Sequence, residues 1–168
     1  MRRPYRKHNM TPPLRIGHGY DIHRVKPGGR MVLAGVEVST EMSPDAHSDG
    51  DIVYHAIVDA ILGAIGQGDI GEHFSDKDDR WKNADSGQFV DHAMKLASDA
   101  GYVVVNADVS ILAERPKLKV FKKAMQANLE KRLNAPANIK AGTNEATDAI
   151  GRGEAIACHA IVLLAKTS

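Results

Sequence analysis

A chain of 168 residues is long enough for one domain with a substantial core and short for two. Its 22 lysines and arginines nearly balance 21 aspartates and glutamates, so the net charge of +1 gives no support for nucleic acid or an anionic membrane as a partner. A single cysteine, Cys158, excludes an internal disulfide framework, and no apolar run reaches the length of a membrane span, which predicts a soluble, cytoplasmic protein.

Residues 1–13 are basic and proline-containing with little to bury, which predicts a disordered basic tail before a domain at 14–168. The first predicted strand of that domain carries half of a metal site. Strands are predicted at 14–23 and 31–38, joined as a hairpin by turn residues. Side chains two apart on a strand share a face, so Asp21 and His23 present a carboxylate and an imidazole together.

A second histidine-bearing segment follows and would supply the rest of the site. Apolar residues recur with a helical period over 52–65, and Ser48 with Asp51 three residues later fits a capping box, which predicts that the helix begins at Ser48. On that register Asp51, His55 and Asp59 lie one turn apart on a single polar face. We interpret Asp51 and Asp59 as groups that support the ligands or stabilise the helix.

Two histidines and one carboxylate around an open coordination position fit two chemistries. One is a zinc ion acting as a Lewis acid, and the other is an iron(II) oxygenase built on a two-histidine, one-carboxylate triad. Such oxygenases usually place the triad on a β-barrel, whereas His55 is predicted on a helix, so the pattern favours zinc.

The rest of the chain alternates helices and strands. Residues 66–82 form a glycine-rich, acidic stretch without a period, typical either of a binding loop or of a mobile surface loop, and Trp81 favours a loop that packs. The further predicted elements are a helix at 86–100, a strand at 102–112, a helix at 117–133 with Pro116 in its first turn, and strands at 138–141 and 155–165. This order predicts an α/β fold with one mixed sheet covered by helices.

A polar loop at 142–154 separates the last two predicted strands. Backbone amides beside its glycines, with Thr143 and Arg152 nearby, could hold phosphate oxygens. Taken alone this is a weak motif. No Walker-type loop, nucleophile elbow or dinucleotide fingerprint is present in the sequence, so nucleotide hydrolysis, serine acyl transfer and dinucleotide redox chemistry lack support.

Several of these stretches together resemble one enzyme family, the 2-C-methyl-D-erythritol 2,4-cyclodiphosphate synthases. They are Arg-Ile-Gly-His-Gly-Tyr-Asp-Ile-His at 15–23, Ala-His-Ser-Asp-Gly-Asp at 46–51 with His55, Gly-Asp-Ile-Gly at 68–71, and Gly-Arg-Gly-Glu-Ala-Ile-Ala-Cys at 151–158. The resemblance runs from about Leu14 to Lys166, with the motifs in the family's order and spacing.

The resemblance implies an activity and an assembly. The assembly would be a homotrimer with active sites at subunit interfaces. The activity would be that of a lyase in the non-mevalonate route to isoprenoid precursors. The substrate would be 4-diphosphocytidyl-2-C-methyl-D-erythritol 2-phosphate, whose 2-phosphate attacks the β-phosphorus to give the cyclic diphosphate and CMP. An intramolecular transfer brings its own nucleophile, which agrees with the absence of a serine or cysteine nucleophile motif.

The resemblance also implies roles for particular residues. Zinc would be held by Asp21, His23 and His55, and a magnesium or manganese ion by Glu145. Asp21, His23, His47 and Thr143 would be catalytic. The substrate-binding set would be Ser48 near the phosphates, Asp69, Ile70, Gly71 and Asp76 around the methylerythritol, Ala113, Pro116, Lys117, Leu118, Ala141 and Thr143 around cytidine, and Arg152.

One segment departs from the family pattern. After Glu145 the family usually has Lys-Leu-Gly-Phe, whereas this chain has Ala-Thr-Asp-Ala at 146–149. The family's phenylalanine lines an apolar cavity on the trimer axis where isoprenoid diphosphates bind with help from the arginine matched by Arg152. Ala149 and Asp148 therefore predict weak or absent isoprenoid diphosphate binding. A non-catalytic binding protein on the same fold remains the alternative to an enzyme.

Overall fold

The computed structural model describes residues 13–75, 79–81 and 84–167. The predicted basic tail at 1–13 therefore lies outside the described residues except for Pro13. Among the helices of the described residues, none is both long enough and apolar enough to cross a lipid bilayer.

A five-stranded mixed sheet forms the centre of the molecule. Its strands, in spatial order, are β4 (Met42–Pro44), β1 (Leu14–Pro27), β7 (Ala155–Lys166), β5 (Tyr102–Leu112) and β6 (Ala137–Gly142). Only β5 and β6 run parallel, joined through a helix, and the other neighbours are antiparallel. The predicted α/β class with one mixed sheet is confirmed.

The predicted hairpin between residues 14–23 and 31–38 is wrong. Strand β1 runs on to Pro27 and pairs with β7 and β4. The second segment instead folds on itself as β2 (Met31–Leu33) and β3 (Val36–Ser39), a separate two-stranded sheet. Ala34 and Gly35 form the tight turn between them, with φ values of 47° and 71°. Two consecutive left-handed residues are what a two-residue hairpin turn requires.

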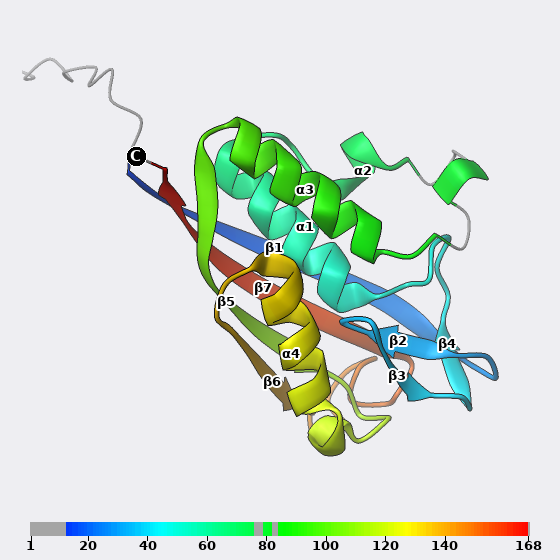
Figure 1. Ribbon diagram of the computed structural model, residues 1–168. Helices are drawn as coiled ribbons and strands as arrows, with labels where there is room; N and C mark the ends of the chain where they lie inside the picture. The colour runs from blue at the N-terminus through cyan, green and yellow to red at the C-terminus, as the bar shows by residue number, and fades with distance from the viewer. Residues whose placement is uncertain (1–12, 76–78, 82–83, 168) are drawn as a thin grey trace, which may run out of the picture.

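Three helices cover one face of the sheet (Figure 1): α1 (Ile52–Ile65), α3 (Gly87–Asp99) and α4 (Lys122–Leu133). The core lies between this layer and the sheet. Helix α1 packs directly on the backbone of β1 at two glycines. A Cβ atom on Gly17 would lie 1.7 Å from the carbonyl oxygen of Ala60, and one on Gly19 would lie 1.9 Å from that of Ala56. This close approach fixes α1 relative to β1.

Two helix starts differ from the prediction. Helix α1 begins after Asp51, not at Ser48, because the Asp51 side chain caps the helix by accepting hydrogen bonds from the N–H groups of Val53 and Tyr54. The helix predicted at 117–133 is divided: a 3₁₀ turn (Leu118–Val120) precedes α4, and the peptide bond before Pro116 is cis.

The 66–82 stretch contains a short helix, α2 (Ile70–His73), and a 3₁₀ turn (Asp79–Trp81).

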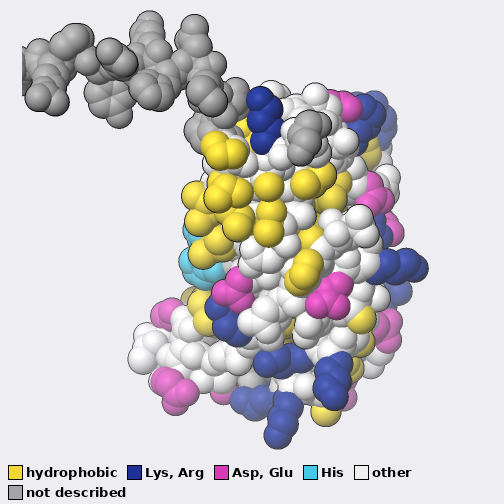
Figure 2. Space-filling view, turned by 60° about the vertical axis from the view of Figure 1, so that its left-hand side comes forward, with side chains coloured by type: hydrophobic (Ala, Val, Ile, Leu, Met, Phe, Trp, Pro, Cys, Tyr) yellow, Lys and Arg dark blue, Asp and Glu magenta, His cyan; other side chains and the backbone are white. Residues whose placement is uncertain are grey.

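The opposite face of the sheet exposes apolar side chains. Strand alternation sends Ile16, Tyr20 and Ile22 of β1 to this face, and Ile16 is 71% exposed. Ile161 of β7 lies opposite His18 on the same face and is 44% exposed. Figure 2 shows hydrophobic side chains gathered on one side of the molecule with histidine beside them. A contiguous apolar surface of this kind is typical of an interaction site.

Candidate metal centre and active site

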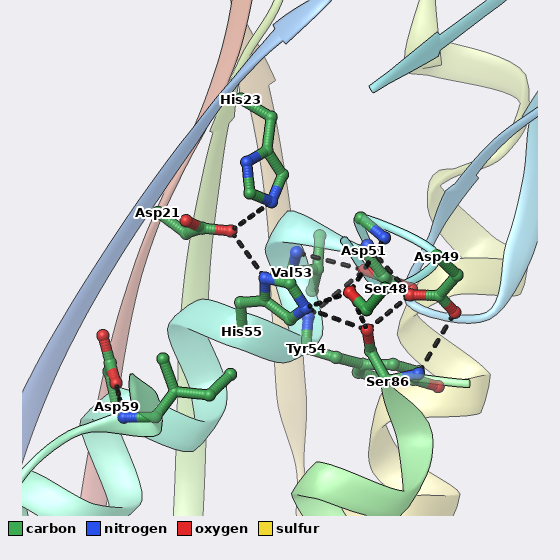
Figure 3. A network of polar contacts seen from close by, with 12 residues as sticks. Asp21, His23, Ser48, Asp49, Asp51, Val53, Tyr54, His55, Asp59 and Ser86 are labelled. Carbon is green, nitrogen blue, oxygen red and sulfur yellow. Dashed lines mark hydrogen bonds and ion pairs between the residues drawn. The ribbon is translucent and has the colours of Figure 1, made fainter. Parts of the chain in front are cut away.

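Asp21, His23 and His55 converge at one point between β1 and α1. The Asp21 Oδ2 atom lies 3.2 Å from His23 Nε2 and 2.9 Å from His55 Nδ1. All three candidate ligand atoms lie within 4.8 Å of one another. Strand alternation presents the first two side chains, and the packing of α1 on the β1 glycines brings the third to them (Figure 3). The predicted grouping of these three residues is confirmed.

The arrangement fits a transition-metal ion. Among the described residues, His23 Nε2 is a buried side-chain atom without a hydrogen-bond partner, and it points to the same place as the Asp21 carboxylate. A buried polar atom without a partner is costly unless a ligand satisfies it. Two imidazole nitrogens and one carboxylate oxygen suit zinc and related divalent ions and leave a coordination position open.

The pKa values of the three groups reflect their mutual contact. Burial alone would raise the pKa of Asp21, but the hydrogen bond to His55 and the charges of both histidines bring it below its usual range. Burial lowers the pKa of His23, and the Asp21 charge offsets this only in part. Burial would also lower the pKa of His55, yet the bond and charge of Asp21 leave it raised.

The far side of His55 contacts a polar network that the sequence analysis did not identify. His55 Nε2 lies 2.9 Å from Ser86 Oγ and 3.1 Å from Ser48 Oγ. The Ser86 hydroxyl donates to Asp49 Oδ1, and the Ser86 backbone N–H donates to Asp49 Oδ2 at 3.1 Å (Figure 3). Ser86 is fully buried. The sequence signal for Ser86 was only that of a helix start.

Asp51 lies behind this network, and its position corrects the prediction of a polar face. The carboxylate is fully buried and accepts hydrogen bonds from the N–H groups of Ala34 and Gly35 at 2.9 and 2.8 Å, besides the two at the start of α1. Burial raises its pKa to about 6, although these bonds favour the carboxylate. Asp51 therefore joins the β2–β3 turn to α1.

Asp59, one turn beyond His55, connects α1 to the next segment. Its carboxylate accepts a hydrogen bond from the Ile70 N–H at 2.8 Å. Burial raises the pKa of Asp59. Asp69 caps α2 by accepting from the Glu72 N–H at 3.1 Å. These contacts hold α2 beside the metal centre.

A cavity of about 460 Å³ opens beside the three converging side chains. Its wall includes the predicted site residues His47, Ser48, Ile70 and Gly71 together with Asp21, His23 and His55. The predicted packing of Trp81 is confirmed, because its ring lies 5.1 Å from that of Phe74 and 5.7 Å from that of Phe89, both in the same wall. Asp76 lies outside the described residues.

A second, separate cavity of about 420 Å³ contains the residues predicted around cytidine. All six line it: Ala113, Pro116, Lys117, Leu118, Ala141 and Thr143. The Thr143 hydroxyl donates to Glu145 Oε1 at 2.8 Å, so the predicted magnesium ligand lies at this cavity's edge. Among the residues that the structure describes, none lines both this cavity and the one beside the metal centre.

Comparison with known proteins assigns the chain to a family. The YgbB family profile matches residues 14–165. The chain belongs to the YgbB family. The 2-C-methyl-D-erythritol 2,4-cyclodiphosphate synthase of Geobacter metallireducens is 48% identical over 91% of this chain and 99% of its own length. The chloroplastic synthase of Oryza sativa subsp. japonica is 44% identical over 92% of this chain and 71% of its own length.

Solved structures agree with the YgbB assignment. The CDP complex of IspF from Plasmodium falciparum has a TM-score of 0.83 at 34% identity, covering 95% of this chain and all of its own. A CDP-bound 2C-methyl-D-erythritol-2,4-cyclodiphosphate synthase has a TM-score of 0.82 at 35% identity, covering 89% of this chain and 99% of its own. The predicted family, and an enzyme in place of a binding protein, are confirmed.

Arg152 of this YgbB chain lies apart from both cavities described above. It lines a third cavity, of about 950 Å³, together with Ala149, Arg24 and Arg115. Its guanidinium donates two hydrogen bonds to Glu154, at 2.9 and 3.0 Å. The idea that Thr143 and Arg152 hold one phosphate together is therefore not supported within a single copy of the chain.

Proposed function

We propose that this chain converts 4-diphosphocytidyl-2-C-methyl-D-erythritol 2-phosphate to 2-C-methyl-D-erythritol 2,4-cyclodiphosphate and CMP. The observation that carries the proposal is the convergence of Asp21, His23 and His55 beside a cavity, in a chain of the YgbB family. In the reaction an oxygen of the 2-phosphate forms a bond to the β-phosphorus. The bond from that phosphorus to the CMP oxygen breaks, and CMP leaves with the electron pair.

The metal at this centre is proposed to be zinc, held by Asp21 Oδ2, His23 Nε2 and His55 Nδ1. A zinc ion there supplies a Lewis acid that neutralises phosphoryl charge. A magnesium or manganese ion, both of which prefer oxygen ligands, is proposed to bind through Glu145. The backbone of Glu145 is left-handed, with φ of 50°. The Thr143 hydroxyl donates a hydrogen bond to the Glu145 carboxylate and holds this conformation.

The protein's own part in the reaction is alignment, because the substrate carries its nucleophile. His47 and Ser48 lie in the wall beside the metal centre, where they can donate hydrogen bonds to phosphate oxygens. Asp69, at the start of α2, is proposed to accept hydrogen bonds from the methylerythritol hydroxyls, beside Ile70 and Gly71. The packed rings of Phe74, Trp81 and Phe89 give one part of the cavity wall an apolar surface.

The cytidine moiety is proposed to bind in the cavity that contains Ala113, Leu118 and Thr143. Its lining combines apolar side chains such as Leu118 with Lys117, Lys119 and Lys122, which suits a base next to phosphates. The two solved relatives named above were determined with CDP, which supports a cytidine nucleotide as the ligand of this family.

A homotrimer with active sites between copies is proposed from the resemblance to the cyclodiphosphate synthases. The substrate has to reach the metal centre and the cytidine cavity at once, and the described residues of one chain line these as two separate cavities. The exposed apolar face of the sheet offers a surface through which copies can associate. Sedimentation that yields a stable monomer at the assay concentration would contradict this part of the proposal.

The cytoplasm is proposed as the location, with no nucleic acid or membrane as a partner. The balanced charge of the chain supports the expectation that neither nucleic acid nor an anionic membrane is a partner. The plant relative is named chloroplastic. Fractionation of cells that produce the chain, followed by detection in the soluble and organelle fractions, tests the location directly.

Phosphorus NMR tests the reaction. The purified chain is incubated with the proposed substrate and magnesium, with and without a strong chelator. Appearance of CMP and a cyclic diphosphate, abolished by chelation, supports the reaction and its metal dependence. Absence of turnover from protein with bound zinc would refute the proposal. His55→Ala should fold, lose zinc and lose turnover, and metal analysis that finds iron in place of zinc would favour the oxygenase alternative.

A further inference from the structure

The fully buried hydroxyl of Ser86 does not cap its own helix. Serine is among the preferred N-cap residues, and Ser86 occupies that position in α3, yet its side chain makes no cap hydrogen bond. The hydroxyl instead lies between His55 Nε2 and Asp49 Oδ1. The Ser86 side chain therefore contacts His55, 31 positions away in the sequence, and does not form a local helix cap. This contact holds the hydroxyl in its position.

The hydrogen-bond directions in this network follow from the donors available. The Ser86 hydroxyl donates to Asp49 Oδ1 and the Ser86 backbone N–H donates to Asp49 Oδ2, so the hydroxyl proton points to Asp49. The Ser86 oxygen then has only lone pairs to offer His55. The His55 Nε2 atom must therefore carry a proton and donate it to Ser86, which leaves Nδ1, the nitrogen in contact with Asp21 Oδ2, as the atom whose lone pair a metal ion can take.

We infer that Ser86 and Asp49 are positioning residues that fix the tautomer and ring orientation of His55 so that Nδ1 is its metal-binding atom. Ser48, 3.1 Å from the same nitrogen, is a weaker second acceptor. The inference rests on the proposed metal centre. Polar partners behind a metal-binding histidine typically change metal affinity by about 10–100-fold when they are removed.

Zinc affinity, measured by competition with a chromophoric chelator, tests the inference in the full chain. Ser86→Ala should weaken zinc binding about 10-fold or more. Asp49→Asn should give a smaller loss, because the amide oxygen still accepts from Ser86 while its NH₂ group opposes the Ser86 N–H. The matched control is Ser98→Ala, an exposed serine on the same helix, which should bind zinc like the unchanged chain.

A spectroscopic readout separates positioning from mere support of the fold. In the zinc-loaded chain labelled with nitrogen-15, His55 should show a slowly exchanging Nε2–H and a metal-bound Nδ1. That protected proton should disappear in Ser86→Ala. Unchanged zinc affinity in both variants, or zinc on Nε2 of His55, would overturn the inference. Failure of the unchanged chain to bind zinc would instead refute the proposed metal centre.

Discussion

Replacing Asp51 by alanine tests whether this buried carboxylate holds the α1 start and the β2–β3 turn together. The variant removes the cap of α1, which costs about 1 kcal/mol. It also leaves the N–H groups of Ala34 and Gly35 without their partner, at about 1–3 kcal/mol each where they stay buried. Relief of a buried charge, visible in the pKa raised to about 6, offsets part of this loss.

The net expectation is a loss of about 2–4 kcal/mol in the free energy of unfolding at neutral pH. For a chain of this size that corresponds to a melting temperature lower by roughly 5–15 °C. Urea denaturation at fixed protein concentration measures it, with an unchanged slope required for a valid comparison. Asp45→Ala is the control, because that carboxylate is exposed and forms an ion pair with Lys26 at the surface. A loss below about 0.5 kcal/mol for Asp51→Ala would refute the reasoning.

Three further predictions follow from the described geometry. Because the pKa of Asp51 is raised from 3.8 to about 6, its contribution to stability is largest below pH 3.8 and is lost as the pH rises through about 6, by about 3 kcal/mol. The stability difference between the unchanged chain and Asp51→Asn should therefore shrink over that window in urea titrations, and a difference that grows with pH would contradict it. Gly19→Ala should abolish soluble folded protein, since its Cβ would overlap the Ala56 carbonyl, whereas Gly63→Ala on the open side of α1 should be tolerated, as circular dichroism would reveal. Geranyl diphosphate should bind weakly or not at all by calorimetry, and Ala149→Phe, in the cavity shared with Arg152, should strengthen it; tight binding to the unchanged chain would sink this expectation.

The metal-binding triad was predictable because each of its members follows from a local rule. Strand alternation places Asp21 and His23 on one face, and the helical period places His55 near the start of α1. The grouping of the six cytidine-cavity residues came from the resemblance alone. No local pattern connects Ala113 to Thr143, which come together only because β5 and β6 pair in parallel.

Other features depended on contacts that a single sequence does not encode locally. The turn at Ala34 and Gly35 was missed because alanine rarely adopts a positive φ, so one continuous strand was predicted. Ser48 resembled a helix cap, but Asp51 takes that role, since only its carboxylate reaches both α1 and the turn. Ser86 and Asp49 meet across 37 positions of sequence, and nothing in either segment signals the contact.

The separation of the two cavities has a genetic consequence. If each active site combines the metal centre of one copy with the cytidine cavity of another, a substitution in the metal centre and a substitution in the cytidine cavity affect different halves of the site. A chain altered at His55 and a chain altered at Thr143 would each be inactive alone. Assembled together from unfolded or dissociated chains, they would regenerate some sites with both sides intact, so two null alleles would complement each other.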